Sequence, residues 1–123
     1  MILLEISPLE VQKDFPAFFH RNSRFFALHH DNNDVGLYGI QEITRSTCKI
    51  ALLIFEKYRF KIPYRKMINL VLRYPYSCGF DIILISTIKK SVATLLYQCH
   101  KLGVRFLGYS SNKIWFKAER IST

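Results

Sequence analysis

Disulfide and metal-binding patterns are missing from this 123-residue sequence. Its three cysteines, Cys48, Cys78 and Cys99, are odd in number and far apart, and no pair forms a C-x-x-C arrangement. This pattern argues against a disulfide framework and favours a reducing compartment. The four histidines have no spacing with each other or with a cysteine that suits zinc, so we predict no metal site.

Long apolar segments are also missing. A charged side chain interrupts every apolar run before it reaches the roughly 18 residues that a membrane-spanning helix needs. Residues 1–7, MILLEIS, lack the basic start and the long apolar core of a signal peptide. We therefore expect a cytoplasmic protein with no membrane span.

Acidic residues are scarce. The chain has 18 Lys and Arg against 9 Asp and Glu, a formal net charge of +9. Such a surface attracts phosphate groups, whether those of a nucleic acid, a nucleotide cofactor or an anionic lipid. Half of the residues are hydrophobic and 15% are aromatic, which is enough to form one buried core. We predict a single domain over residues 1–123, without linkers or repeats.

The first half of the chain predicts four strands and one helix. Ser7 and Pro8 are residue types of a helix N-cap and a first helical position, and apolar residues follow at roughly helical spacing. The Asp and Asn run at 31–34 separates two aromatic and β-branched runs, which predicts a hairpin turn. The third strand is apolar almost throughout, which is typical of a central strand covered on both faces. The expected elements are a strand at Ile2–Ile6, a helix at Leu9–Phe19 and an antiparallel meander of Arg24–His30, Val35–Ile43 and Cys48–Phe55.

The second half predicts two helices and three strands. Pro63 suits the first position of a helix, Tyr74-Pro75 is expected to end that helix, and Gly103 suits the C-cap of the next one. Ser110-Ser111-Asn112 predicts the turn of a terminal hairpin. The expected elements are a helix at Tyr64–Arg73, a strand at Phe80–Ile85, a helix at Lys89–Leu102 and strands at Val104–Tyr109 and Lys113–Ala118.

These elements follow the order β-α-β-β-β-α-β-α-β-β, which predicts an α/β fold with a mixed sheet. The order, with its meander, basic turn and terminal hairpin, resembles the GNAT superfamily of N-acetyltransferases from Ile2 to Ala118. The order of elements is also similar to that of short GNAT-like proteins encoded by tailed phages. A phage-encoded protein of this kind would lie in the host cytoplasm or in the virion.

The resemblance implies an acetyl-CoA site directly after the central strand. In the family, a turn patterned Q/R-x-x-G-x-G/A binds the cofactor pyrophosphate through backbone amides at the start of a helix. The corresponding turn here keeps Arg59 at the first position, but Ile62 and Tyr64 stand where the family has small residues. Basic side chains around the turn would compensate in part. The expected cofactor-binding residues are Phe55, Lys57, Arg59, Lys61, Ile62, Tyr64 and Arg65.

The resemblance also implies a general acid in the last helix. The family uses a Tyr there to return a proton to the CoA thiolate. Alignment on Gly103 puts Cys99 at that position, whereas a different helix register puts Tyr97 there, so both are candidates. A base must also deprotonate the amine acceptor, and Glu56 at the end of the central strand is one candidate. Other candidate bases are Gln41, Glu42, His29 and His30.

Three functions remain open at this point. The first is an N-acetyltransferase that transfers an acetyl group from acetyl-CoA to an amine. The second is a GNAT-like domain without chemistry that binds a protein partner, as a phage virion assembly factor or an inhibitor of a host machine; the missing glycines favour it. The third is a nucleic-acid-binding protein that uses its basic surface and the aromatic residues Tyr58, Tyr64, Tyr74 and Tyr76.

Overall fold

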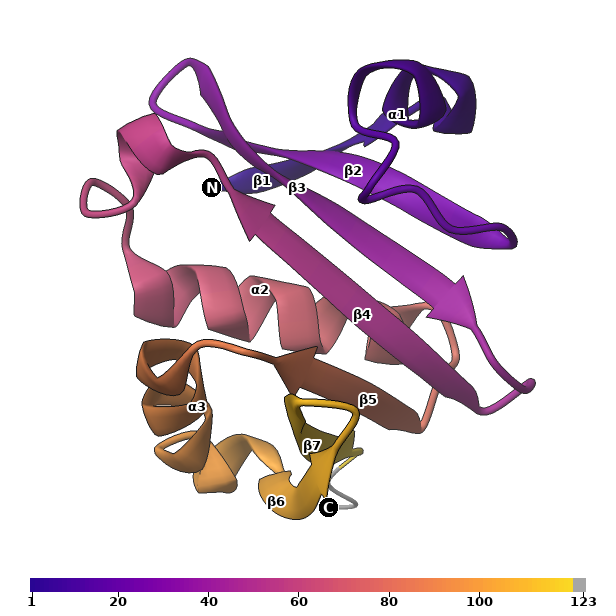
Figure 1. Ribbon diagram of the computed structural model, residues 1–123, viewed down its shortest axis with the longest axis vertical. Helices are drawn as coiled ribbons and strands as arrows, with labels where there is room; N and C mark the ends of the chain where they lie inside the picture. The colour runs from indigo at the N-terminus through magenta and orange to yellow at the C-terminus, as the bar shows by residue number, and fades with distance from the viewer. Residues whose placement is uncertain (121–123) are drawn as a thin grey trace.

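The computed structural model of the protein describes residues 1–120, apart from the side chains of Ser91 and His100. A seven-stranded sheet runs through it in the order β1-β2-β3-β4-β5-β7-β6 (Figure 1). Every pair of neighbours is antiparallel except β4 and β5, which are parallel. The strands are β1 (Ile2–Ile6), β2 (Ser23–His30), β3 (Asn33–Glu42), β4 (Thr47–Ile54), β5 (Ile82–Thr87), β6 (Val104–Ser110) and β7 (Lys113–Glu119).

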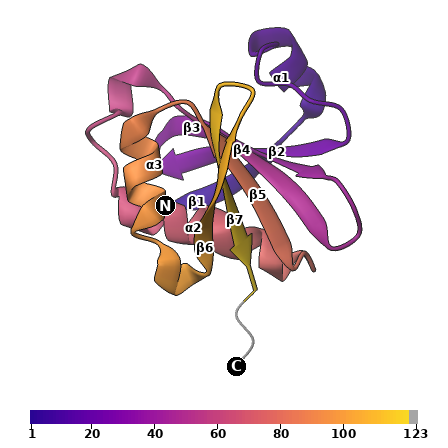
Figure 2. The same ribbon diagram turned by 60° about the horizontal axis from the view of Figure 1, so that its bottom comes forward.

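The helices lie on both faces of the sheet. Helices α2 (Tyr64–Ser77) and α3 (Lys90–Tyr97) cover one face, and α1 (Pro8–Asp14) lies on the other (Figure 2). Two short 3-10 turns, η1 (Glu56–Tyr58) and η2 (His100–Leu102), follow β4 and α3. The order of strands and α-helices is the predicted one, and the predicted α/β fold with a mixed sheet is confirmed. Within residues 1–120, no helix combines the length and hydrophobicity that crossing a bilayer requires.

Both predicted hairpins have two-residue turns in the left-handed backbone conformation. The φ angles are +50° and +62° at Asp31 and Asn32, and +53° and +60° at Ser111 and Asn112. Asn and Asp tolerate this conformation, and two such residues in succession match the right-handed twist of the flanking strands. The turn chemistry therefore closes both hairpins, and the register of each then shifts at an irregularity, between Leu28 and His29 in β2 and between Phe106 and Gly108 in β6.

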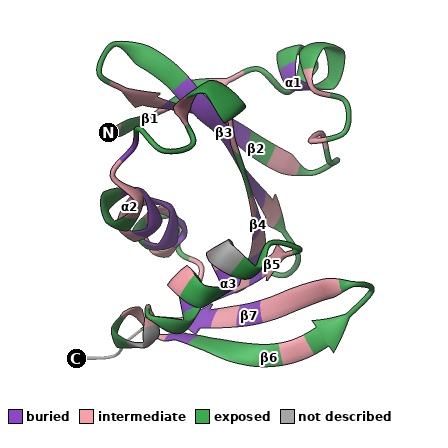
Figure 3. Cartoon of the chain, turned by 60° about the vertical axis from the view of Figure 1, so that its left-hand side comes forward, coloured by how far each residue is buried: buried purple, intermediate pink, exposed green. Residues whose placement is uncertain are grey.

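The main core lies between the sheet and α2 and α3, where Figure 3 shows the buried residues in purple. Alternate strand residues supply it, so Phe26 and Leu28 belong to this core while Phe25 faces α1. On the α1 side, Phe18 and Phe19 pack against Phe25 with ring centroids 6.0 and 5.9 Å away. The main core includes Tyr38, Ile40, Cys48, Ile50, Met67, Ile68, Val71, Leu72, Ile83, Ile85, Leu96 and Phe116.

Two helices are shorter than predicted. Helix α1 ends at Asp14 instead of Phe19, because the Phe15 N–H closes the helix on the Val11 carbonyl and Pro16 has no N–H to continue it. Helix α3 ends at Tyr97 instead of Leu102, and a 3-10 turn leads to Gly103, whose φ is +82°. The chain thus reaches β6 through a tighter path than one continuous helix would give.

Helix α2 is longer than predicted, because it continues through Pro75 to Ser77. A proline inside a helix cannot donate to the carbonyl four residues earlier, here that of Val71. The buried Tyr38 hydroxyl of β3 donates to this carbonyl instead, with an O–O distance of 2.6 Å. The lost helical hydrogen bond is therefore replaced from the sheet, which allows the helix to pass the proline.

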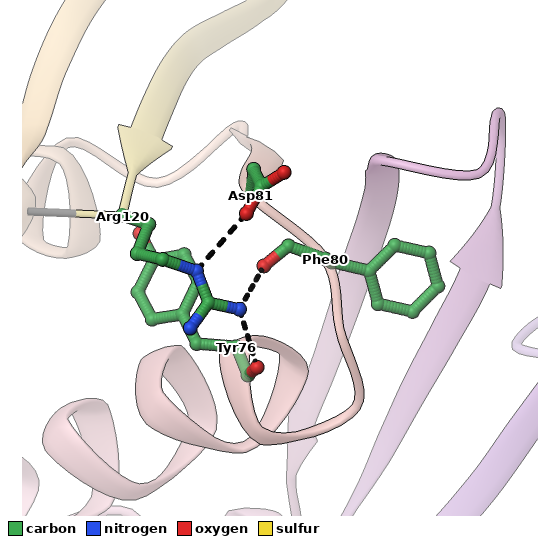
Figure 4. Close-up of polar contacts among 4 residues, drawn as sticks. All are labelled: Tyr76, Phe80, Asp81 and Arg120. Atoms are coloured by element: carbon green, nitrogen blue, oxygen red, sulfur yellow. Dashed lines mark hydrogen bonds and ion pairs between the residues drawn. The ribbon is translucent and has the colours of Figure 1, made fainter. Parts of the chain in front are cut away.

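Arg120, directly after β7, joins the end of this strand to the α2–β5 loop (Figure 4). Its guanidinium donates to the Asp81 carboxylate at 3.0 Å and to the carbonyl oxygens of Tyr76 and Phe80 at 2.6 and 3.0 Å. The Tyr76 carbonyl lies in the last turn of α2, where carbonyls lack helical partners and a cation is favourable. One side chain thus fixes the C-terminal end of α2 to the end of the sheet.

Candidate functional site

The parallel strands β4 and β5 separate at their carboxyl ends (Figure 1). Their pairing begins at Thr47 and Ile82 and ends at Ile50 and Ile85. Strand β4 nevertheless continues to Ile54 and stays paired with β3 over its whole remaining length. The β5-facing edge of β4 beyond Ile50 therefore has no strand beside it, and its backbone N–H and C=O groups are open to a ligand.

This separation also corrects one prediction. The run from Cys48 to Phe55 was expected to be covered on both faces, but Leu52 and Leu53 are each 37% exposed. They lie in the part of β4 that has left β5. Leu52 and Leu53 therefore line an open cleft. Only the first half of β4, which is paired on both edges, is a central strand as predicted.

A cavity of about 660 Å³ occupies the gap between β4 and β5, and side chains of α2 and α3 line it on the sheet face that these helices cover. Its volume lies within the range of sites for cofactors and small molecules, roughly 300–1,000 Å³. Its walls are mainly apolar and include Ile50, Leu52, Ile54, Met67, Val71, Ile85, Val92 and Leu95.

Polar and basic side chains also line this cavity. Arg59 and Tyr64 come from the segment after β4, and Lys89 comes from the segment after β5. The carboxyl ends of neighbouring parallel strands are a usual place for ligand sites in α/β sheets. Helix α2 also begins there, and the N–H groups of its first turn have no helical partners and favour anions. The remaining polar lining residues are Ser86, Thr87, Thr94 and Gln98.

The turn between β4 and α2 uses several of its own backbone donors. The N–H groups of Tyr58, Arg59 and Lys61 each donate to a carbonyl three residues earlier, at 2.9, 3.2 and 3.0 Å. The Tyr64 hydroxyl donates to the Arg59 carbonyl, and Pro63 has no N–H. Phe60, which is 97% exposed, lines the cavity. Compared with a glycine-rich turn, this turn presents more side chain and fewer free amides to a ligand.

Only Arg59 and Tyr64 among the predicted cofactor-binding residues line the cavity. Phe55 stacks on Phe15, with ring centroids 5.7 Å apart and an interplanar angle of 19°. Ile62 is 8% exposed and belongs to the main core, where it anchors the turn. The other three are exposed basic residues around the turn, namely Lys57, Lys61 and Arg65.

The three predicted catalytic residues do not line the cavity either. Glu56 is exposed in η1, at the end of β4. The Tyr97 ring packs against the rings of Phe106 and Phe116, at centroid distances of 5.6 and 5.2 Å. The thiol of Cys99 donates to the Leu95 carbonyl at 3.2 Å. Burial raises the pKa of Cys99, and the nearby Arg65 opposes this effect.

The other candidate bases lie away from the cavity. His29 and His30 are at the β2–β3 turn. The His29 Nδ1 lies 3.0 Å from the Asp34 Oδ1, and the His30 Nε2 lies 3.5 Å from the Asp31 Oδ2. Gln41 is opposite Lys49 on the neighbouring strand, and Glu42 is opposite Cys48.

Sequence reasoning missed most of the β5 side of the cavity. Ser86 and Thr87 end β5 and line the cavity, and Lys89, two residues after β5, lines it as well. Gln98 also lines it, between the two residues proposed as acids. A usable signal was present, because polar residues at the carboxyl end of a parallel strand are expected near a ligand.

Comparisons with known proteins identify the fold. No protein-family model matches the chain, and no curated protein matches it. Among solved structures, it is similar to the IAA acetyltransferase from Bacillus cereus ATCC 14579, with a TM-score of 0.71 and 16% identity over 97% of this chain and 99% of that chain. It is also similar to the spermidine N-acetyltransferase SpeG F149A mutant from Vibrio cholerae, with a TM-score of 0.69 and 12% identity over 97% and 95%.

A GNAT family acetyltransferase from Elizabethkingia anophelis, solved with acetyl-CoA bound, is similar at a TM-score of 0.64 and 14% identity. The match covers 90% of this chain and 82% of that one. At such identities the similarity concerns the fold, not the residues of a site. The resemblance that the order of elements suggested is confirmed at this level: the chain has the GNAT fold.

Proposed function

We propose that the protein binds acetyl-CoA in the gap between β4 and β5 and transfers its acetyl group to an amine. The observation that carries the proposal is the 660 Å³ cavity at the carboxyl ends of the only parallel strand pair among the described residues. The acetyl-CoA-bound GNAT structure with the same fold supports this choice of ligand. Amine acetylation by a protein of this fold, the spermidine N-acetyltransferase, supports the acceptor class.

The basic residues at the turn would bind the negatively charged part of the cofactor. Arg59 and Lys89 approach the cavity from its two sides, after β4 and after β5. Their guanidinium and ammonium groups, with the first-turn N–H groups of α2, suit a pyrophosphate. Exposed basic residues nearby would add longer-range attraction, namely Lys57, Lys61 and Arg65. Side-chain charge would thus replace part of the amide cradle that a glycine-rich turn provides.

The strand walls would hold the rest of the cofactor. With the cofactor bound, the apolar side chains of Ile50, Leu52 and Ile85 would help to exclude water from the gap. The unpaired edge of β4 would pair with amide groups of the ligand as a neighbouring strand would. Acetyl-CoA would supply an activated acyl group, which passes to the amine nitrogen as the thiol leaves. Ile62 and Phe55 would contribute by fixing the turn and the end of β4 through packing.

The reaction requires a base for the amine proton and an acid for the leaving thiolate. Glu56, at the end of β4, is our proposal for the base. Tyr97 and Cys99 are our proposals for the acid, since they flank Gln98, which lines the cavity. The raised pKa of Cys99 keeps its thiol protonated near neutral pH, as a proton donor requires. Single Tyr97→Phe and Cys99→Ala variants distinguish them, since only loss of the acid should lower kcat by the 10²–10⁴-fold typical of this kind of catalysis.

A thermal-shift titration with CoA and acetyl-CoA tests the binding site. A ligand that binds only the folded state at 100 times its Kd stabilises the protein by about 2.7 kcal/mol, which raises Tm by several degrees. The double substitution of Arg59 and Lys61 by Ala should abolish the shift. Lys13→Ala, in exposed α1 on the other face, is the control and should keep it. Absence of a shift at millimolar cofactor would refute the proposal, and a normal shift in the double variant would refute the assignment of the turn.

The state of the β4–α2 turn favours a binding role without chemistry as a second candidate function. Its amides at Tyr58, Arg59 and Lys61 are used internally, so the turn offers a pyrophosphate fewer donors than a glycine-rich one. A protein partner would then occupy the cavity or the surface around it. A co-purifying partner, with no cofactor-induced shift, would support this function over acetyl transfer.

A further inference from the structure

A second group of residues lies where β4 and β5 part, on the sheet face opposite α2 and α3. Lys49 precedes Ile50, the last β4 residue that pairs with β5, and Trp115 of β7 pairs with Ser86 of β5, one residue beyond the same point. Cys48 and Ile50 belong to the main core, so Lys49 between them faces the other way. The same alternation applies to Trp115, whose neighbour Phe116 is buried in the main core.

The Lys49 ammonium and the indole of Trp115 are in contact across this point. The Lys49 Nζ lies 5.1 Å from the centroid of the Trp115 ring, a cation–π distance. The indole is held in place because its Nε1–H donates to the Ser110 carbonyl at 3.2 Å. Beside Lys49 is a small depression of about 20 Å³, lined in part by the polar side chains of His20, Ser23 and Gln41. The face therefore presents a fixed aromatic plane, a cation and further polar groups together.

The positive charge on this face is not neutralised at Lys49. Nearby, Lys117 and Arg105 share the Glu119 carboxylate, at 2.6 and 2.7 Å. Within residues 1–120, no ion pair involves Lys49 or Lys113. Lys113 lies two residues before Trp115 on β7, so its side chain is on the same face as Trp115 and Lys49. Burial lowers the pKa of Lys49, and repulsion from Lys113 lowers it further. A bound anion would relieve this repulsion.

We propose that this face holds the acceptor amine and that the acceptor carries a negatively charged group, a carboxylate or a phosphate, bound by Lys49 and Lys113. The inference rests on the proposed function: β4 and β5 are unpaired beyond Ile50 and Ile85, so a thioester in the gap would be reached from this face between the two strands. Trp115 would pack against the carbon skeleton of the acceptor. A polyamine such as spermidine would meet like charge here and would be disfavoured.

Trp115 makes binding measurable without cofactor, because it is the single tryptophan of the chain. Its emission would be followed at constant ionic strength while β-alanine, O-phosphoethanolamine or propylamine is added. We expect a saturable change with an anionic probe and none with propylamine, and the better of the two anionic probes identifies the group as carboxylate or phosphate. Equal responses to all three probes would refute the proposal. So would inorganic phosphate binding as tightly as O-phosphoethanolamine, since the site would then select an anion alone.

Charge-removing variants complete the test. Lys49→Gln and Lys113→Gln should each weaken binding of the better probe about tenfold or more, because a hydrogen bond to a charged group is lost. Arg73→Gln, exposed on α2 across the sheet from this face, should change nothing. Unchanged affinity in both charge variants would refute the assignment, whether or not either one is less stable.

Acetyl transfer to the same probes separates this inference from the function on which it rests. If CoA causes no thermal shift while the anionic probes still change the Trp115 emission, acetyl transfer is refuted and the anion site stands. If CoA binds and spermidine is acetylated faster than the anionic amines, the acceptor proposal is refuted and acetyl transfer stands. Faster acetylation of the anionic amines, reduced by Lys49→Gln, supports both.

Discussion

Replacing Tyr38 with Phe removes one hydroxyl from the core and leaves the Val71 carbonyl without its donor from β3. That hydroxyl donates at 2.6 Å to a carbonyl that Pro75 cannot serve, and Tyr38 is fully buried. A buried acceptor left unsatisfied costs about 1–3 kcal/mol, so we expect the free energy of unfolding to fall by that amount. Urea denaturation followed by circular dichroism measures it.

The reason for this cost is tested by a double-mutant cycle with Pro75→Ala. Alanine restores an N–H that can donate to Val71, so Tyr38→Phe should cost about 1 kcal/mol less in that background. Pro75→Ala also changes packing, because Pro75 is buried, and the diagnostic quantity is therefore the coupling between the two sites. The same Tyr38→Phe cost in both backgrounds would refute the idea that Tyr38 replaces the missing helical donor.

Tyr76→Phe provides a matched control on the same helix. The Tyr76 hydroxyl is buried and has no hydrogen-bond partner among the described residues, and its burial raises the pKa of Tyr76 to about 12. Removing it relieves an unpaired polar group, so we expect unchanged or higher stability. A loss as large as that of Tyr38→Phe would show that hydroxyl deletion is costly here whatever the hydroxyl contacts.

Two further predictions concern Arg120 and the cysteines. Arg120→Met should lower the free energy of unfolding by about 1.5–3 kcal/mol, because charge-assisted hydrogen bonds to Asp81 and to two carbonyls are lost. Arg120→Lys should lose less stability than Arg120→Met but still fall below the unchanged protein. Unchanged denaturation midpoints in both variants would contradict this. Under native conditions, iodoacetamide followed by mass spectrometry should label exposed Cys78 and leave Cys48 unmodified, since Cys48 is fully buried and burial raises its pKa to about 12. Labelling of Cys48 at the rate of Cys78 would mean that the core opens readily.

The order of elements was predictable because short-range chemistry specifies it. Ser7 and Pro8 start α1 as their residue types require, and the Ser7 side chain accepts the Leu9 N–H. Asp31-Asn32 and the Ser111-Asn112 turn close the two hairpins with left-handed backbone. Such signals depend only on neighbours in the sequence, so they survive in the fold.

The misplaced boundaries and most of the cavity depend on partners distant in sequence. Pro75 predicts a helix end, and only the hydroxyl of Tyr38, 37 residues earlier, allows the helix to continue. In the sequence, nothing distinguishes Lys89 from a solvated lysine. Only the pairing of β5 with β4 shows that Lys89 lies at the cavity. Ile62 was predicted to contact a cofactor from its position in the turn pattern, and its burial in the main core could be known only from the packing. Tertiary contacts, not local propensity, decided these positions.

The parting of β4 from β5 means that the sheet consists of two leaves joined by a short seam. Strands β1–β4 form one leaf and β5–β7 the other. Four residue pairs of β4 and β5 join them within the sheet, next to the Asp81 and Ile82 N–H groups that donate to the Ser46 carbonyl. Arg120, directly after β7 of the second leaf, adds a link to α2 through its hydrogen bond to the Tyr76 carbonyl, at the end of the sheet where β4 and β5 are paired. Any molecule that fills the open end contacts both leaves, so its affinity and the strength of the seam are thermodynamically linked. A substitution of Arg120, far from the opening, should therefore weaken ligand binding in the gap without removing any contact with the ligand.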